Sequence, residues 1–423
     1  GYVLNPEPVY FDVTAENAES ADGITLVIAE KSNIPQKGKI QIVKTGEVFS
    51  SVTEKGGRYT PVYGESGLAG AGFEICAAED VFTPDGTLRY AKGDVVDTLT
   101  TTADGTAESR ELYLGKYEIR EAKAPYGMVR DDSVLTAEMV YAGQNICVTS
   151  TSVAVVNERQ KVEVKLYKDL EQDELFRIGS GDEILHVYFA LYAAEELTAA
   201  DGSVIPADGL IEIAGVQADG TLVFASDLPI GSYVVKEYAV DAPYLISEEI
   251  YPITFTYEDD TTAVVRIEVN NGEAIQNRIV RGSITGIKVD EQGEPLPGAV
   301  FGLFRADCTD FTMENALLTA RSAEDGSFSF ENIPYGVWLV REIAAPAGYV
   351  LSDEIFPVQI GENGQTVGIT VKNSRIPQIP TAPPTGERSA LGFWLGLGSV
   401  ALGGVIACAI MYGKHKKDED DER

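Results

Sequence analysis

The sequence YEIREAKAPYG, at residues 117–127, recurs as YVVKEYAVDAPY at 233–244 and as WLVREIAAPAGY at 338–349. Each stretch begins with an aromatic residue, has a glutamate four positions later and continues into Ala-Pro. Apolar residues alternate with other residues before the glutamate, which is typical of a half-buried β-strand. Repetition of the whole pattern indicates repeated structural units. We therefore expect three copies of one β-rich domain.

The limits of each copy are marked by a lysine and an asparagine. Each copy opens on a short alternating strand that ends in lysine and closes on a strand that ends in asparagine. An Asp-Gly sequence inside each copy predicts a hairpin turn. At both joints the lysine follows the preceding asparagine by 11 positions. These marks give domains at 34–158, 159–279 and 280–375, with opening lysines Lys44, Lys168 and Lys288 and closing asparagines Asn157, Asn277 and Asn373.

Residues 1–33 are similar to the end of a further copy. GYVLNPEPVYFDV from Gly1 matches GYVLSDEIFPVQI from Gly348, and Asn33 precedes Lys44 by the same 11 positions. The chain begins with glycine, and its first thirty residues contain no charged-then-apolar export signal. We expect residues 1–33 to be the C-terminal strands of a truncated domain, in which the lysine partner of Asn33 is missing. The chain would then be a fragment or a processed form.

Strand parity directs one lysine, one glutamate and one asparagine of each copy toward its core. Side chains two positions apart share a strand face, so Lys44 lies with Ile42 and Ile40. The asparagine of the second copy follows this rule more weakly, because its face also carries Glu273. The inward glutamates are Glu121, Glu237 and Glu342.

Burial gives these groups a chemistry that they lack in water. Desolvation favours the neutral form of an amine and of a carboxyl group. A neutral amine is a nucleophile, and a neutral carboxyl group can hydrogen-bond an asparagine side-chain carbonyl and polarise it. If the fold holds the amine against that carbonyl, attack is effectively intramolecular. Ammonia would leave, and a Lys–Asn isopeptide bond would remain.

The lysine strand, the aromatic-to-glutamate spacing with Ala-Pro, and the closing asparagine together resemble the SpaA-like, or collagen-adhesin B-type (Cna_B), domains of Gram-positive surface proteins and pilins. The resemblance implies an all-β chain of tandem prealbumin-like β-sandwiches, similar to Ig-like and transthyretin-like folds. It also implies that the glutamate promotes an autocatalytic crosslink between the first and last strands. The implied triads are Lys44, Glu121 and Asn157; Lys168, Glu237 and Asn277; and Lys288, Glu342 and Asn373.

The C-terminal end has three segments of different character. Residues 376–389 are a Pro-rich linker, 390–412 are an apolar run and 413–423 are a charged tail. At about 1.5 Å per residue, the apolar run is long enough to cross a hydrocarbon core of about 30 Å as one transmembrane helix. The bases that follow it predict a cytoplasmic tail and an outside location for everything before it.

The order of these segments resembles the LPxTG sorting signal of Gram-positive surface proteins. The resemblance implies that a sortase recognises Pro383, Thr385 and Gly386, although Ala382 stands where the family has leucine. The threonine would then be joined to peptidoglycan or to another pilin subunit. The alternative is a permanent single-pass membrane anchor with a Pro-rich linker.

Composition excludes several classes of function. The formal net charge of −33 argues against a nucleic-acid partner bound through its phosphates. Four cysteines and two histidines, scattered without ligand spacing, predict no metal, no cofactor and no histidine-based hydrolase. No catalytic pocket signature is present, so we do not expect an enzyme.

We predict the structural stalk of an adhesin or pilus-like protein, at the cell surface and covalently attached to the cell wall. Two alternatives remain open. The stalk carries an enzymatic or ligand-binding head for a host or extracellular-matrix ligand in a missing N-terminal region, or the chain is a sortase-polymerised pilin subunit.

Overall fold

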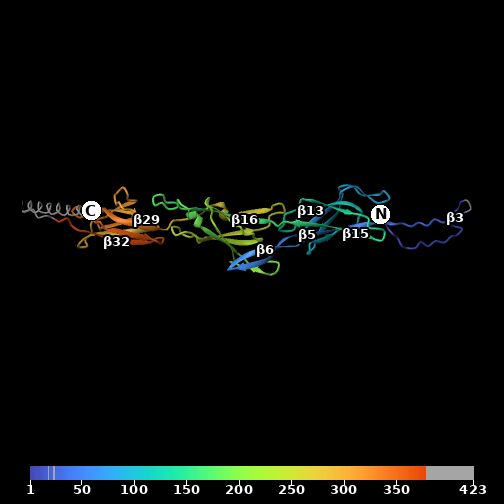
Figure 1. The fold of residues 1–423 in the computed structure, drawn as a ribbon, viewed down its shortest axis with the longest axis horizontal. Helices are drawn as coiled ribbons and strands as arrows, with labels where there is room; N and C mark the ends of the chain where they lie inside the picture. The colour runs from blue at the N-terminus through green and yellow to red at the C-terminus, as the bar shows by residue number, and fades with distance from the viewer. Residues whose placement is uncertain (18, 22–23, 378–423) are drawn as a thin grey trace, which may run out of the picture.

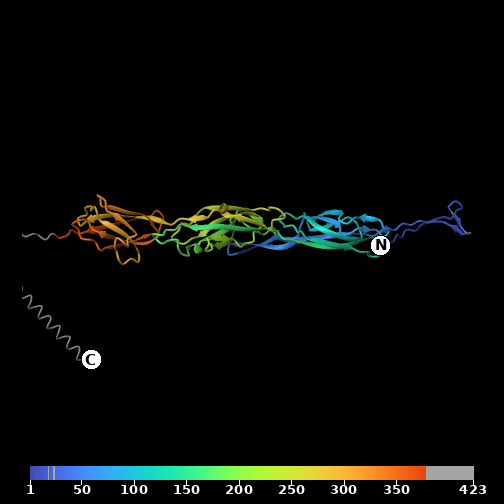
Figure 2. The same cartoon turned by 90° about the horizontal axis from the view of Figure 1, so that it is seen from above.

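The computed structural model describes residues 1–17, 19–21 and 24–377. These residues form three β domains in a row, with an N-terminal hairpin projecting from one end (Figure 1, Figure 2). The sorting motif and the apolar segment at 390–412 lie outside the described residues. Among the residues described, no helix is both long enough and apolar enough to span a membrane.

The regular elements of the first domain are all β-strands. Its elements are β5 (Lys37–Lys55), β6 (Arg58–Gly67), β7 (Gly72–Ala77), β8 (Val81–Phe82), β9 (Leu88–Tyr90), β10 (Val95–Thr100), β11 (Thr106–Glu108), β12 (Leu112–Tyr113), β13 (Gly115–Lys123), β14 (Val134–Met139) and β15 (Val148–Asn157).

The second domain adds two 3₁₀ turns to its strands. Its elements are β16 (Lys161–Leu170), η1 (Glu183–His186), β17 (Tyr188–Ala193), β18 (Leu197–Thr198), β19 (Val204–Ile205), β20 (Leu210–Gly215), β21 (Thr221–Val223), β22 (Gly231–Ala239), β23 (Ile250–Phe255), β24 (Val264–Glu268), η2 (Val269–Gly272) and β25 (Ile275–Asn277).

The third domain is the smallest of the three. Its strands are β26 (Arg281–Asp290), β27 (Val300–Arg305), β28 (Leu318–Arg321), β29 (Ser327–Pro334), β30 (Gly336–Ala344), β31 (Ile355–Ile360) and β32 (Thr366–Asn373).

All three domains share one topology of two sheets packed on a common core. In the third domain the sheet orders are β29-β26-β32 and β28-β27-β30-β31, and the first and second domains repeat this arrangement. The first and last strands of each domain are parallel neighbours: β5 with β15, β16 with β24 and β25, and β26 with β32. This pairing brings the residue that opens each domain beside the residue that closes it.

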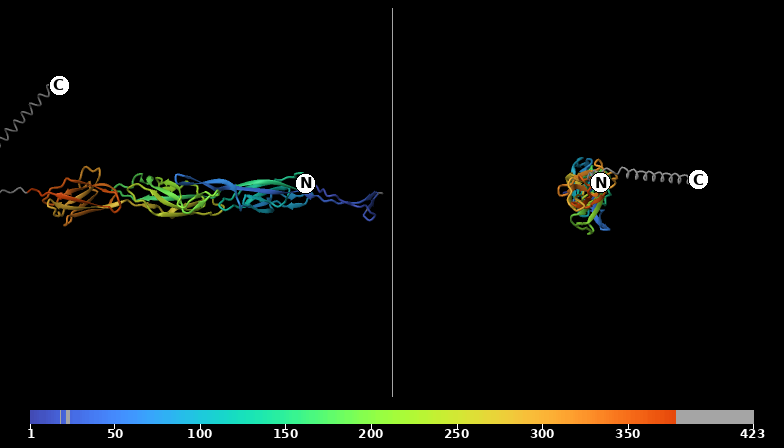
Figure 3. Two further views of the ribbon diagram at one scale, coloured as in Figure 1. Left: turned by 90° about the horizontal axis from the view of Figure 1, so that it is seen from below. Right: turned by 90° about the vertical axis from the view of Figure 1, so that its left-hand side faces the viewer.

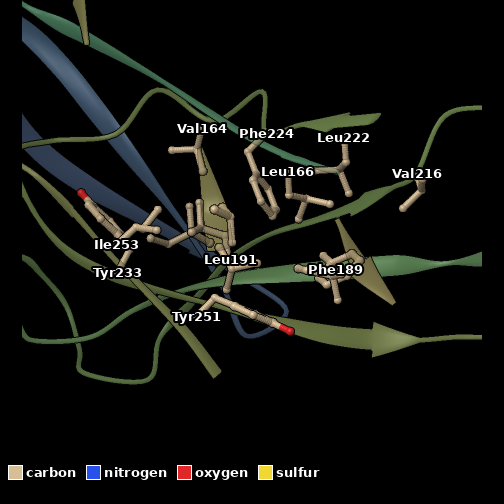
Figure 4. Packing of buried hydrophobic residues seen from close by; sticks show 14 of the residues in the cluster. Val164, Leu166, Phe189, Leu191, Val216, Leu222, Phe224, Tyr233, Tyr251 and Ile253 are labelled. Carbon is tan, nitrogen blue, oxygen red and sulfur yellow. The ribbon is translucent and has the colours of Figure 1, made fainter. Parts of the chain in front are cut away.

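Each domain has its own hydrophobic core, as the second shows in Figure 4. The aromatic residue that opens each repeated stretch is fully or almost fully buried in it. Tyr117 and Tyr233 donate their hydroxyl groups, and Trp338 its indole N–H, to the backbone carbonyl four residues earlier. A large ring with one polar atom therefore suits this position, because that atom has a partner inside the core.

The opening strand of the first domain is longer than the sequence predicted. β5 does not end at Lys44 but continues to Lys55 and pairs with β6 in a long hairpin. The hairpin lies along the second domain (Figure 3), where Phe49, Val52 and Tyr59 pack against its core. Gly56 and Gly57, both with positive φ, form the two-residue turn of the hairpin. The packing of the hairpin on the second domain has no local signal in the sequence, because it depends on residues far along the chain.

The second junction is bridged by the segment that follows Lys168. Phe176 is buried in the core of the third domain, with its ring centroid 4.9 Å from that of Trp338. Arg281 binds Glu171 at 2.8 Å and Asp173 at 2.9 Å. At both junctions, the residues that follow the lysine of the opening strand extend onto the next domain and pack against its core.

The N-terminal segment runs outward from the first domain and returns to it. β1 (Tyr2–Val3) pairs with β4 (Ile34–Pro35), and β2 (Glu19–Ala21) pairs with β3 (Ile24–Leu26) farther out. Asn33 is exposed, and none of the side chains described in residues 1–33 is buried. The assignment of this segment to a further domain stays a prediction.

Candidate functional site

Nine polar side chains from the three repeats lie inside the domains. Their exposed fractions range from 0% to 7%, and Lys44 and Lys288 are both at 0%. The parallel pairing of first and last strands sets their register. In every domain the asparagine pairs with the residue two positions beyond the lysine, so both side chains enter the core on the same face.

In the first domain the three side chains are in direct contact. The Lys44 amine donates to Oδ1 of Asn157. The Asn157 Nδ2 group is 3.0 Å from both carboxylate oxygens of Glu121, and the Lys44 Nζ atom is 3.5 Å from Oε1 of Glu121. The asparagine amide therefore has its oxygen toward the amine and its nitrogen toward the carboxylate.

The third domain repeats this arrangement almost unchanged. The Lys288 amine donates to Oδ1 of Asn373, and the Asn373 Nδ2 group donates to Oε1 of Glu342 at 2.9 Å. The Lys288 Nζ atom is again 3.5 Å from the glutamate. The first and third domains therefore share one arrangement of the lysine, glutamate and asparagine side chains.

The second domain buries the same residue types but does not join the lysine to the asparagine. The Lys168 amine donates to the backbone carbonyls of Asp169 at 2.7 Å and Ile275 at 2.8 Å. Asn277 donates to Glu237 at 2.8 Å, while its own Oδ1 atom is buried without a partner. The closing strand is interrupted here by η2, where Asn270 and Asn271 have positive φ.

Desolvation dominates the electrostatics of the three lysines. It lowers the pKa of Lys44 and of Lys288, although the facing glutamate opposes the shift in each case. Desolvation also lowers the pKa of Lys168 to about 8, against the opposing charges of Glu237 and Asp169. All three amines are therefore easier to deprotonate than a lysine in water, as nucleophilic attack requires.

The glutamate occupies a different place from the one expected. The sequence suggested that its carboxyl group would polarise the asparagine carbonyl, but the carboxylate contacts the asparagine nitrogen instead. It lies between that nitrogen and the lysine amine. This position suits transfer of a proton from the attacking amine to the departing nitrogen.

Sequence reasoning missed a backbone group that holds each glutamate. The N–H of the residue ten positions later donates to Oε2 of the glutamate, from Asp131 at 2.8 Å, Ser247 at 2.5 Å and Ser352 at 2.9 Å. Because the donor is a backbone N–H group, the three donor residues need not share a side-chain type. Only the constant offset of ten positions marks it in the sequence.

The predicted Asp-Gly turns are present, but the prediction that they close hairpins is wrong. The Asp-Gly turns connect β10 with β11, β20 with β21 and β28 with β29, which belong to opposite sheets. Each turn closes by its own local hydrogen bonds, such as Gly105 N–H to the Thr102 carbonyl at 2.9 Å. An Asp-Gly sequence specifies the tight turn but not the sheet that the next strand joins.

Comparison with known families matches two parts of the chain. Residues 61–152 and 282–375 match the SpaA family, a prealbumin-like fold domain. These ranges lie in the first and third domains, and the second domain has the same topology. The described part of the chain is therefore an all-β array of tandem prealbumin-like domains. A comparison of the sequence with curated proteins finds no match.

Several solved structures are similar to this chain. The Bacillus anthracis TIE protein is 23% identical with a TM-score of 0.54, and the match covers 85% of this chain and 57% of that chain. This likeness shows a shared fold, and the present chain spans 57% of the length of that structure.

Two pilins also match, with lower TM-scores. BcpA, the major pilin subunit of Bacillus cereus, is 18% identical with a TM-score of 0.34, covering 81% of this chain and 100% of that chain. The full-length major pilin SpaD from Corynebacterium diphtheriae is 16% identical with a TM-score of 0.23, covering 82% and 100%.

Proposed function

We propose that this chain is the structural, non-enzymatic stalk of a Gram-positive surface adhesin or pilus-like protein, and that Lys–Asn isopeptide bonds formed by its own domains stabilise it. One observation carries the proposal. In the first and third domains a fully buried lysine amine contacts the asparagine side-chain carbonyl, while a glutamate holds the amide nitrogen that would leave.

The reaction needs no reagent beyond these three side chains. The neutral lysine amine attacks Cγ of the asparagine, a C–N bond forms, and the original C–N bond of the amide breaks. The glutamate takes a proton from the attacking nitrogen and supplies one to the leaving nitrogen, which departs as ammonia. The glutamate ends in its starting state, so each domain undergoes one irreversible turnover.

The crosslink would change how each domain carries force. Tension enters at the start of the first strand and leaves at the end of the last strand, and these strands are parallel neighbours. With Lys44 joined to Asn157, the load crosses directly between them and residues 45–156 lie outside its path. This is a mechanical role suited to a stalk.

In this proposal, the C-terminal sequence attaches the stalk to the cell surface. A sortase would recognise Pro383, Thr385 and Gly386, and the chain would become attached to peptidoglycan or to other pilin subunits at the cell surface. The test is to incubate the membrane-bound chain with the sortases of the bacterium that produces it. A chain that still keeps residues 390–412 afterwards would contradict this part of the proposal.

We extend the proposal to residues 1–33 as the end of a further domain. At each described domain junction, the N–H three positions after the asparagine donates to a backbone carbonyl within or just after the Ala-Pro sequence. The bonds run from Gln160 to Gly127 and from Val280 to Pro243, both at 2.8 Å. Gln36 makes the same bond to Gly1 at 3.0 Å. Restoring upstream sequence should protect residues 1–33 from protease, and continued cleavage there would count against the extension.

Intact-mass spectrometry of the purified chain tests the crosslinks. We expect the first and third domains each to lose one ammonia completely. Glu121→Gln should abolish the loss in the first domain only, while Glu118→Gln, on the other face of the same strand β13, should leave it unchanged. The second domain should react more slowly, because Lys168 must first leave two backbone carbonyls.

A wild-type mass equal to the sequence mass would overturn the proposal. Loss of ammonia that survives Glu121→Gln would retain the crosslink but refute the assigned role of the glutamate. Fragmentation of the linked peptides identifies which lysine and which asparagine are joined.

A further inference from the structure

A tight turn lies against the backbone of the reactive lysine in every domain. The glycine of each Asp-Gly turn has a positive φ of 76° to 80°. Its carbonyl oxygen accepts the lysine N–H at 2.7 Å, in the pairs Gly105 with Lys44, Gly220 with Lys168 and Gly326 with Lys288.

The contact leaves no room for a side chain on the glycine. A Cβ atom on Gly105 would lie 2.3 Å from the backbone oxygen of Lys44, and the corresponding distances are 2.6 Å at Gly220 and 2.4 Å at Gly326. Real Cβ atoms essentially never come that close to another atom. The obstacle is backbone and cannot swing aside as a flexible side chain can.

Further hydrogen bonds fix the turn and the lysine on both sides. Asp104 accepts the Thr106 N–H at 3.1 Å, and the same bond recurs at 3.0 Å in the other two turns. The Lys44 carbonyl accepts the Leu68 N–H at 3.0 Å, as the Lys288 carbonyl accepts that of Leu296 at 2.9 Å. The lysine main chain is therefore held from two directions at the point where its side chain enters the core.

We propose that Gly105, Gly220 and Gly326 are positioning residues for the crosslinking reaction. Each allows its turn to approach the lysine backbone closely, and in the first and third domains the amine held in this way contacts the asparagine. This inference rests on the proposed function, since it concerns the rate of that reaction. The glycines do not touch the reacting atoms and act only through the lysine main chain.

The first domain supplies a matched control for this role. Gly86 lies in a second Asp-Gly-Thr turn with φ of 82°, close to the 79° of Gly105. Its N–H bonds the Thr83 carbonyl at 2.9 Å as that of Gly105 bonds Thr102, but a Cβ on Gly86 would meet nothing within 4 Å. The two glycines share their backbone conformation and differ in contact with the lysine.

The test compares Gly105→Asn with Gly86→Asn in the full chain. Asparagine tolerates positive φ, so both changes cost little backbone strain. Ammonia loss is followed by mass spectrometry during cell-free synthesis, and the linked peptides assign it to a domain. Gly105→Asn should slow the reaction of the first domain about 100-fold, the scale of a 1 Å misplacement of a reacting group. Gly86→Asn should react at the wild-type rate, and the third domain of each variant serves as an internal standard.

A second pair of variants weakens each turn without adding atoms beside the lysine. Asp104→Ala removes the carboxylate that accepts the Thr106 N–H, and Asp85→Ala removes its counterpart, which accepts the Thr87 N–H. We expect slower crosslinking only for Asp104→Ala. This pair keeps the test decisive if Gly105→Asn prevents the first domain from folding.

The possible outcomes separate the two proposals. Wild-type rates in both Gly105→Asn and Asp104→Ala would overturn the positioning role while leaving the crosslink intact. Equal slowing by Gly86→Asn would also overturn it, because the effect would then belong to any turn in the domain. No ammonia loss from the wild-type first domain would overturn the proposed function itself.

Discussion

The Lys168 amine is a measurable probe of what burial does to a single residue. Desolvation lowers its pKa from 10.5 to about 8, so the folded domain holds the lysine proton less tightly than the unfolded chain. Between about pH 8 and pH 10.5 the unfolded state therefore binds more protons. Stability must rise with pH across this window, because unfolding takes up protons there. Below the folded pKa both states are protonated, and the folded state bears the full cost of a buried charge.

This pH dependence is visible only where the crosslink cannot form. Asn277→Ala keeps Lys168 but removes its partner, and we expect the urea midpoint of its second domain to rise from pH 8 to pH 10. The double variant Lys168→Met with Asn277→Ala should lack this rise. Pulse proteolysis in urea measures both midpoints. A urea midpoint of the single variant that does not change with pH would contradict the desolvation of Lys168.

At the scale of strands, parity was the most informative part of the sequence. It pointed all nine triad residues inward, because a period-two pattern assigns faces without any knowledge of tertiary structure. Three features depended on the tertiary arrangement, which strand parity does not encode. They are the amide orientation of Asn157, the backbone donor at Asp131 and the failure of Lys168 to reach Asn277.

The contact of the β5–β6 hairpin with the second domain is the clearest feature that was not predicted from the sequence. Its outer half contacts the second domain, with Val52 N–H donating to Ser203 Oγ at 2.8 Å and Arg58 Nε donating to the Ile211 carbonyl at 2.6 Å. Arg159, at the joint itself, stacks 3.7 Å from the ring centroid of Tyr63 and pairs with Asp227. Apolar packing and these polar contacts together hold the first junction straight.

Shortening the hairpin should loosen the junction without touching the triad. Replacing residues 50–62 by Asn-Gly closes the hairpin with a two-residue turn and removes the contacts that Val52, Arg58 and Tyr59 make with the second domain. We expect a smaller maximum dimension in small-angle X-ray scattering, because the two domains would bend, and unchanged ammonia loss from the first domain. Lys55→Ser, at the exposed tip, is the control. An unchanged scattering profile would contradict the role given to the hairpin.

For the whole molecule, the parallel first and last strands and the in-line domains make tension the decisive test (Figure 3). Lys44 and Asn157 are 113 positions apart, so a crosslink would keep most of the first domain from extending. Lys44→Met should release this segment in a single-molecule pulling experiment, with an added contour length of about 370–400 Å at about 3.3–3.6 Å per residue. On the loop-entropy model, it should also lower the domain's stability by about 4–5 kcal/mol. Lys39→Met changes a partly exposed lysine on the same strand and should add no length. An equal extension of wild type and Lys44→Met would mean that no covalent tie carries the load.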